Sequence, residues 1–307
     1  MLKKFLKHLK HPTDFLLYLS NFGLYDFWSD ETYLKFMYRI KMGKKLNLKN
    51  PQTFNEKLQW LKLYNRKPEY TKMVDKYAVR KYIADTIGEE YLIPLLGVWD
   101  DPDDIDFEKL PDQFVLKCNH NSGLGMCICQ DKSKLDINKV KKELKKGLKQ
   151  DYYLPAREWP YKNVPRKVIA EKYMEDGSSD GSLRDYKIMC FNGKALYSFV
   201  CTDRFSEKGL HVTFFDRNWK VMPFERHYPY LKEGVPKPFN YDKMLYLAEI
   251  LSKNIPFVRV DFYEINKKLY FGELTFFPGS GYEEFTPEEW DLKLGKLIDL
   301  SEVAMEK

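Results

Sequence analysis

The sequence predicts an α+β fold with a helical region at its N-terminus. Residues up to about 65 show helical patterns rich in aromatic side chains. From Tyr91 onward, short apolar runs typical of strands are interspersed with helical segments. Several runs are close enough in sequence to form antiparallel hairpins, which favours α+β architecture over a doubly wound parallel sheet. The chain of 307 residues is long enough for two domains, or for one large domain with an extension.

The composition excludes several classes of protein. Hydrophobic residues make up 44% and charged residues 31% of the chain, which is typical of a globular protein and not of a disordered or fibrous one. The net charge of +6 is mild, so we expect no nucleic-acid partner. Five cysteines without a Cys-x-x-Cys pair argue against a disulfide framework or a structural zinc site and favour the cytoplasm. No apolar run approaches the roughly 18–20 residues that span a bilayer.

The first ten residues have the pattern of a short basic amphipathic helix. Four apolar side chains recur at helical spacing among four lysines within residues 1–10. Such a helix can lie on an anionic membrane surface, which would make the protein peripheral to the inner face of the cell membrane. It can equally pack its apolar side on the protein's own core. The pattern alone leaves both alternatives open.

Further helices follow from local signals. Thr53 and Glu56 form a capping-box pattern in front of an apolar stretch. A second helix is expected from about Glu69 to Gly88, and a lysine-rich helix over residues 139–149. Another is expected from about Tyr241 to Lys253, and a last one near the C-terminus.

Two apolar strands flank a polar, glycine-containing loop between Phe114 and Cys129. The pair Gly123 and Gly125 does not complete a dinucleotide-binding fingerprint, and the following residues favour a strand over a helix. The backbone N–H groups of such a hairpin loop can close over phosphates, while a lysine at the strand end neutralises their charge. The alternative is an ordinary turn. The candidate residues are Lys117, Asn119, His120, Ser122 and Gly123.

The apolar strand that begins at Val168 runs directly into charged residues. This pattern is compatible with a connection between two subdomains whose backbone faces an adenine edge, although it fits any strand end. Glu171 could accept a hydrogen bond from the exocyclic amine of adenine. The candidate residues are Glu171, Lys172, Tyr173 and Met174.

A hairpin near the C-terminus carries paired carboxylates. If the chain turns about Lys267, Asp261 lies opposite Glu273 and Arg259 lies opposite Thr275. Two opposed carboxylates repel each other unless a cation lies between them. Mg²⁺ that also contacts nucleotide phosphates suits so few carboxylates. The alternative is a solvent-facing hairpin whose acids are neutralised by Arg259 and Lys268.

Taken in order, these motifs resemble the ATP-grasp enzymes, and specifically their teichuronopeptide-biosynthesis (TupA-like) group. The resemblance extends from about Thr53 to Leu297. It includes a helical Asp75-Lys76 pair, the strand lysine Lys117, the hinge Glu171, and the carboxylates Asp261 and Glu273. Many ATP-grasp enzymes have Asn where this chain has Thr275. The segment Thr275–Gly279 matches a Thr-Phe-x-Pro-Gly pattern that the TupA-like group shares.

The resemblance implies an ATP-grasp fold, in which two α+β subdomains clasp ATP. We expect an N-terminal helical region over residues 1–65 and an ATP-grasp domain over residues 66–307. Within that domain we expect a smaller ATP-lid subdomain at about 110–174 and a larger metal-binding subdomain at about 175–307. The implied cofactors are ATP and Mg²⁺. The implied site consists of ATP-binding Lys76, Lys117, Asn119, His120, Ser122, Gly123, Glu171, Lys172, Tyr173 and Met174, the metal-binding Asp261, Glu273 and Thr275, and the catalytic Arg259 and Lys187.

The resemblance also implies a reaction and a setting. ATP-grasp enzymes generally convert a carboxylate into an acyl phosphate, which an amine then attacks to form an amide. The TupA-like group implies bacterial surface polysaccharide biosynthesis, including capsule, with a small-molecule or lipid-linked saccharide substrate that carries a carboxylate or an amine. The alternatives are a sugar kinase of ATP-grasp type, a non-catalytic scaffold, and a glycosyltransferase that uses the acidic segment Asp101-Pro102-Asp103.

Overall fold

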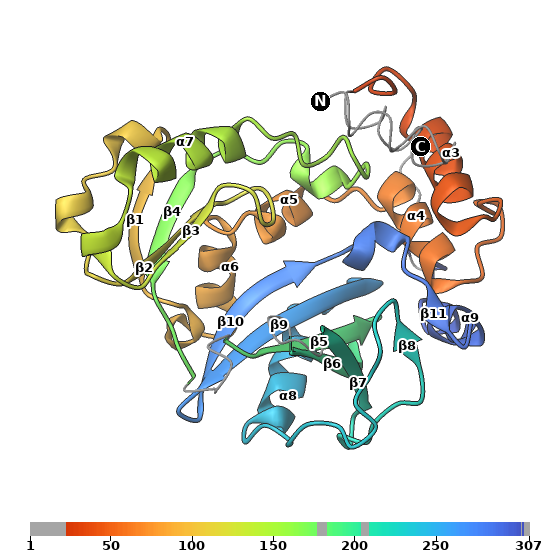
Figure 1. Cartoon of the computed structure of the whole chain (residues 1–307). Helices are drawn as coiled ribbons and strands as arrows, with labels where there is room; N and C mark the ends of the chain where they lie inside the picture. The colour runs from red at the N-terminus through yellow and green to blue at the C-terminus, as the bar shows by residue number, and fades with distance from the viewer. Residues whose placement is uncertain (1–22, 177–182, 204–208, 302, 304–307) are drawn as a thin grey trace.

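The computed structural model describes residues 23–176, 183–203, 209–301 and 303 (Figure 1). The expected basic helix over residues 1–10 lies outside this part of the chain. None of the helices in the described ranges is long and apolar enough to cross a membrane.

The N-terminal region is helical, as the sequence predicts. It contains α3 (Asp30–Met42), α4 (Phe54–Tyr64), α5 (Pro68–Val74) and α6 (Val79–Thr86). The capping box at the start of α4 is confirmed, because the Thr53 side chain accepts from the Glu56 N–H and the Glu56 side chain accepts from the Thr53 N–H.

One expected helix is interrupted. The sequence predicts a single helix from about Glu69 to Gly88, but the structure has two: α5 ends at Val74 and α6 begins at Val79. At the break, the Asp75 carboxylate accepts hydrogen bonds from the backbone N–H groups of Tyr77 (2.8 Å) and Ala78 (3.2 Å). An aspartate that binds the N–H groups of following residues starts a new helix more readily than it continues an old one.

The smaller sheet has four antiparallel strands in the order β1-β4-β2-β3. It includes residues upstream of the boundary expected at about residue 110. One of its faces packs against α7 (Ile137–Leu148) around a separate core that includes Phe114, Leu144 and Val168. The strands are β1 (Leu95–Trp99), β2 (Phe114–Cys118), β3 (Met126–Cys129) and β4 (Val168–Lys172).

The larger sheet has five antiparallel strands in the order β10-β9-β5-β6-β7. The helix α8 (Tyr241–Leu251) packs on one face, where Ser198 Oγ lies 2.7 Å from Tyr241 Oη. The strands are β5 (Asp185–Phe191), β6 (Lys194–Thr202), β7 (His211–Asp216), β9 (Phe257–Ile265) and β10 (Lys268–Thr275). A two-stranded ribbon of β8 (Glu225–Arg226) and β11 (Phe285–Thr286) precedes α9 (Glu289–Lys296).

The two sheets form the two halves of the molecule. Figure 1 shows the smaller sheet with α7 above the larger sheet with α8, and α5 and α6 between them. The main core joins α4, α5 and α6 to the larger sheet and to α8 and α9. The helices α4–α6 are therefore part of the larger half and not an independent unit.

Gly295 marks the tightest approach between α9 and the start of α4. A Cβ atom at this position would lie 2.2 Å from the carbonyl oxygen of Gln52 and 2.7 Å from the backbone nitrogen of Phe54. Backbone atoms cannot move aside as a flexible side chain can. We therefore expect Gly295→Ala to lower the free energy of unfolding by about 1–3 kcal/mol, measured by urea denaturation. Lys296→Ala, at an exposed position of the same helix, is the control. Equal stability of the two variants would contradict this packing.

Candidate active site

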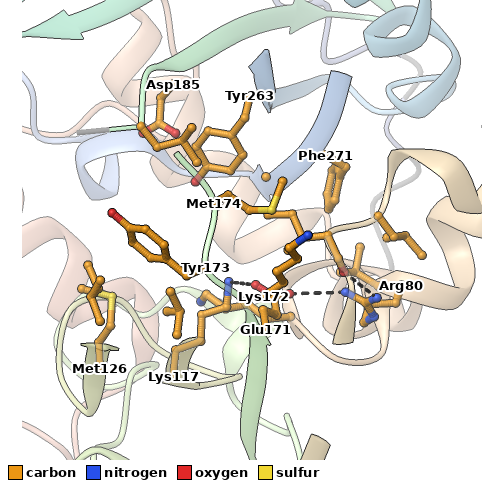
Figure 2. Close-up of a pocket in the computed structure, with 18 of the residues that line it drawn as sticks. Arg80, Lys117, Met126, Glu171, Lys172, Tyr173, Met174, Asp185, Tyr263 and Phe271 are labelled. Atoms are coloured by element: carbon orange, nitrogen blue, oxygen red, sulfur yellow. Dashed lines mark hydrogen bonds and ion pairs between the residues drawn. The ribbon is translucent and has the colours of Figure 1, made fainter. Parts of the chain in front are cut away.

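A cavity of about 390 Å³ lies between the smaller and the larger sheet. Residues from α6, β2, β3 and β4 line it on one side, and residues from β9 and β10 line it on the other (Figure 2). Most of the lining surface is apolar, and Figure 2 shows Arg80, Lys117 and Glu171 close together at one side, with Asp185 at another. The apolar residues are Val79, Leu92, Ile93, Val115, Met126, Ile128, Met174, Leu183 and Phe271.

Glu171 is held between two cations in this cavity. Its Oε2 atom lies 2.6 Å from Lys117 Nζ, and its Oε1 atom lies 3.3 Å from Arg80 Nη1 (Figure 2). Arg80 also donates to the carbonyl oxygen of Ile93 at 2.9 Å. Each carboxylate oxygen keeps a second lone pair, so Glu171 can still accept a hydrogen bond from a ligand. The sequence analysis missed Arg80, because one arginine inside a helix belongs to no recognisable spacing.

Three residues after Glu171 line the same cavity, as the sequence predicts for a hinge. They are Lys172, Tyr173 and Met174. Tyr173 and Met174 follow the last residue of β4, so their backbone groups lie outside the sheet ladder. The Tyr173 hydroxyl accepts from Gln130 Nε2 at 2.6 Å, which connects the segment after β4 to the residue that follows β3.

Lys76 holds the predicted phosphate loop through a hydrogen bond to its backbone. Lys76 Nζ donates to the carbonyl oxygen of Asn121 at 2.5 Å, and burial lowers the pKa of this lysine. Lys76 and Lys117 both line the cavity. Ser122 and Gly123 are exposed at the loop tip, where Gly123 adopts a φ of +83°. The tip of the loop is therefore open to solvent.

Asn119 and His120, both assigned to ATP binding, are buried, and like Ser122 and Gly123 they do not line the cavity. The side chain of Asn119 is fully buried and makes three hydrogen bonds within the protein, to Asp75 Oδ1 (2.7 Å), the carbonyl oxygen of Pro165 (2.8 Å) and the backbone N–H of Lys167 (2.7 Å). His120 is buried, with Nε2 3.1 Å from the carbonyl oxygen of Gln150. Both side chains hold the loop against neighbouring segments of the protein and do not line the cavity.

The carboxylate hairpin has the predicted register at one end and a bulge in the middle. Thr275 pairs with Arg259, as expected. The chain turns at Asn266 and Lys267, which have φ values of +50° and +62°, as a two-residue hairpin turn requires. The register then shifts between Phe271 and Leu274, so that Gly272 and Glu273 together face Asp261.

A guanidinium group lies between the two carboxylates. Arg259 Nη2 is 2.6 Å from Asp261 Oδ2 and 2.8 Å from Glu273 Oε1. Lys187 Nζ is 2.6 Å from the same Asp261 oxygen. Burial alone would raise the pKa of Asp261, but Arg259 and Lys187 outweigh it and hold this pKa below its usual value. A cation therefore lies between the two carboxylates, as their opposition requires: it is Arg259, as in the alternative without metal, and Lys187 takes the place expected for Lys268.

The hairpin fits a Mg²⁺ ion that is shared with phosphates. Mg²⁺ in nucleotide sites is usually held by one or two carboxylates together with substrate oxygens. The Glu273 side chain is 41% exposed, and Thr275 Oγ1 donates to it at 3.3 Å. Asp261 is buried and would share its oxygens with Arg259 and Lys187. Within the described residues, no group of three or more His, Cys, Asp or Glu converges, so these donors do not form an all-protein cage.

Two facing α+β units with a cavity between them constitute an ATP-grasp fold. Comparison with protein families matches residues 56–299 to the TupA-like ATP-grasp family. The match spans well over half of the chain, and the chain belongs to this family.

Solved structures with a similar fold include two D-alanine–D-alanine ligases. The ATP complex from Bacillus anthracis has 17% identity and a TM-score of 0.39, covering 66% of this chain and 53% of the ligase. The Helicobacter pylori enzyme has 15% identity and a TM-score of 0.40, covering 74% and 61%. The ADP complex of the N5-carboxyaminoimidazole ribonucleotide synthetase purK has 12% identity and a TM-score of 0.44, covering 72% and 50%. The chain thus spans half to three fifths of the length of these proteins. No curated protein sequence matches the chain.

The ionic contacts predict the stability of carboxylate variants. Asp261→Asn leaves Arg259 and Lys187 buried without their common anion, so we expect a loss on the order of 3 kcal/mol in the free energy of unfolding. Glu273→Gln removes a partly exposed charge and should cost less than about 1 kcal/mol. Asp242→Asn, whose side chain is 85% exposed, is the control in urea denaturation at pH 7. An Asp261→Asn variant as stable as the wild type would show that Asp261 does not stabilise the two buried cations.

The same contacts predict a pH dependence. The pKa of Asp261 is lowered in the folded protein relative to roughly 3.9 in an unfolded chain, so its ionised form stabilises the fold fully above that pH. This contribution is lost as the pH falls through the folded pKa. We expect the stability difference between wild type and Asp261→Asn to shrink below about pH 4. A difference that stays constant from pH 7 to pH 3 would show that the charge of Asp261 does not matter.

Proposed function

We propose that this protein is an ATP-dependent carboxylate–amine ligase. The observation that carries the proposal is one cavity of about 390 Å³ that is lined by the Lys117–Glu171 pair on one side and by residues of β9 and β10 on the other. The Arg259–Asp261–Glu273 group lies on the same two strands, beyond the residues that line the cavity. Membership of the TupA-like ATP-grasp family supports it. The smaller sheet would act as the ATP lid and the larger sheet would carry the metal-binding residues.

The apolar part of the cavity fits a nucleobase, with Glu171 and the backbone beyond β4 facing its polar edge. Lys76 and Lys117 would contact the phosphates. Lys117 would then contact both Glu171 and a phosphate oxygen, while Arg80 would still neutralise the negative charge of Glu171. When bound, Mg²⁺ would neutralise charge on the β- and γ-phosphates next to Glu273 and Asp261.

The reaction would proceed in two balanced steps. A carboxylate oxygen of the substrate attacks the γ-phosphorus, the bond to the bridging oxygen of ADP breaks, and an acyl phosphate forms. An amine then attacks the acyl carbon, phosphate leaves, and the amine loses a proton. Arg259 would remain cationic throughout and would stabilise negative charge that develops on the transferred group. Because an acyl phosphate is hydrolysed by water, closure of the smaller sheet over the site is a chemical requirement.

The glycosyltransferase alternative lacks support. Asp103 of the Asp101-Pro102-Asp103 segment is ion-paired with Lys145 on α7, and neither residue lines the cavity. A sugar kinase would use the same nucleotide site and differs only in the product, a stable phosphorylated sugar.

We further propose that the ligase acts in bacterial surface polysaccharide biosynthesis, on a saccharide that is free or lipid-linked. The TupA-like family is the support for this setting. Peripheral attachment of a cytoplasmic protein to the membrane through residues 1–10 would suit a lipid-linked substrate, and the lysines of this segment would make it sensitive to salt.

Binding of Mg-ATP tests the nucleotide site directly. We expect nucleotide at about 100 times its dissociation constant to add about 2.7 kcal/mol to the free energy of unfolding. Lys117→Met should weaken binding at least tenfold in calorimetry, because a charge-assisted contact is lost. Lys268→Met, at an exposed position of the β9–β10 hairpin, is the matched control and should bind as the wild type does. Failure of the folded wild type to bind Mg-ATP would reject the proposed function.

The product decides between ligase and kinase. We expect ADP release to require both a carboxylate, screened among uronic acids and amino acids, and an amine. Mass spectrometry should then detect an amide. A phosphorylated sugar formed without amine would reject the ligase in favour of the kinase.

A further inference from the structure

A row of side chains crosses the larger sheet from the carboxylate hairpin toward β8. Asp261 pairs with Lys187, Lys187 pairs with Phe199, and Phe199 pairs with Phe214. Directly opposed residues of antiparallel strands share a face, so these four side chains lie on one surface. Ser198, the neighbour of Phe199, contacts α8 on the opposite face, so the row faces the smaller sheet.

Arg226 of β8 lies at the end of this row. The centre of its guanidinium group is 4.2 Å from the ring of Phe199 and 5.2 Å from the ring of Phe214. The guanidinium of Arg259 is 5.8 Å from the same Phe199 ring. Two arginines thus border one phenylalanine, and the positive charge of Arg259 and the negative charge of Asp261 both act on Arg226.

The donors of Arg226 are incompletely used. Its side chain is 9% exposed, and neither Nε nor Nη1 makes a hydrogen bond, although Nε is 3.2 Å from Glu283 Oε2. A buried N–H group without an acceptor costs about 1–3 kcal/mol, and more when it is charged. Contact with aromatic rings offsets part of this cost. A guanidinium in this state has the geometry and the charge to bind an incoming planar anion.

The neighbouring ionic groups differ from Arg226 in this respect. Lys187 and Arg259 are both bonded to Asp261, and Arg259 also to Glu273. Their charges are therefore matched by carboxylates of the chain itself. Arg226 approaches one carboxylate, that of Glu283, without forming a hydrogen bond to it. It is therefore the cation of this surface whose hydrogen-bond donors are least used by the chain itself.

We infer that Arg226 binds a carboxylate group of the substrate, held over Phe199 between Arg226 and Arg259. The inference rests on the proposed ligase function, because it adds a substrate-binding residue to the same site. Strands are about 4.8 Å apart, so Phe199, two strands from Asp261, lies roughly 10 Å from the metal-binding hairpin. A carboxylate there belongs to the acid substrate or its acceptor and not to the nucleotide, whose adenine end faces Glu171.

The test measures carboxylate binding separately from nucleotide binding. The full-length protein, saturated with Mg²⁺ and a non-hydrolysable ATP analogue, is titrated with acetate, D-glucuronate, L-glutamate and inorganic phosphate while thermal stability is followed. We expect at least one carboxylate to stabilise the wild type saturably. Arg226→Met should weaken this response at least tenfold, and Arg226→Lys should be intermediate, because lysine keeps the charge without the planar fork.

A matched control is Arg217→Met. Arg217 is ion-paired with Glu249 of α8 on the opposite side of the sheet, and its variant should retain the carboxylate response. All variants should bind the ATP analogue within twofold of the wild type. If Arg226→Met does not fold, the double variant Arg226→Met/Glu283→Gln removes the paired charges together and serves in its place.

The outcomes separate this inference from the proposed function. A wild type that binds the ATP analogue but responds to none of the three carboxylates, or to phosphate alone, would overturn the role of Arg226. Equal carboxylate responses of wild type and Arg226→Met would do the same. Failure of the wild type to bind the ATP analogue would count against the ligase itself.

Discussion

The structure of the site depends on one buried ionic arrangement, in which the Arg259 guanidinium lies between the carboxylates of Asp261 and Glu273. Its position follows from strand geometry, because Arg259 and Asp261 are two residues apart on β9 and share a face. The bulge at Gly272 and Glu273 brings the second carboxylate to the same guanidinium. Any divalent cation at this place must compete with Arg259 for carboxylate oxygens. Binding of a metal would therefore change the contacts that Arg259 makes with Asp261 and Glu273.

A second constraint fixes the chain that follows β10. The side chains of Asn55, Gln59 and Lys62 are buried on one face of α4, at helical spacing. They bond to backbone groups of residues 280–283, and Lys62 Nζ also donates to the carbonyl oxygen of Ala156 at 2.9 Å. Burial lowers the pKa of Lys62 to about 7 despite the opposing charge of Glu158. The helix α4 thus fixes the loop beyond Thr275 through side-chain bonds, in addition to the core that it shares with the larger sheet.

The sequence predicts most elements and the family, and the places where the structure differs from it have physical causes. The alternation of side chains along β9 and β10 predicts that Arg259 pairs with Thr275. No local sequence pattern predicts the bulge at Gly272 and Glu273. Asn119 resembles a phosphate ligand because it is polar and near glycines, yet its partners, Asp75 and Pro165, are distant in sequence. Arg226 belongs to no motif. Its role depends on Phe199 and Phe214, which only the assembled sheet brings beside it.

The carboxylates of Glu171 and Asp261, which belong to the two halves of the site, are each neutralised by two cations of the chain. Without nucleotide, Glu171 is balanced by Lys117 and Arg80, and Asp261 by Lys187 and Arg259. A triphosphate adds several negative charges between these groups, and its oxygens compete with the carboxylates for the same cations. Binding would therefore be favoured by added positive charge, which the proposed divalent cation at Glu273 would supply. Nucleotide and metal should consequently bind more tightly together than separately, because each removes the repulsion that opposes the other.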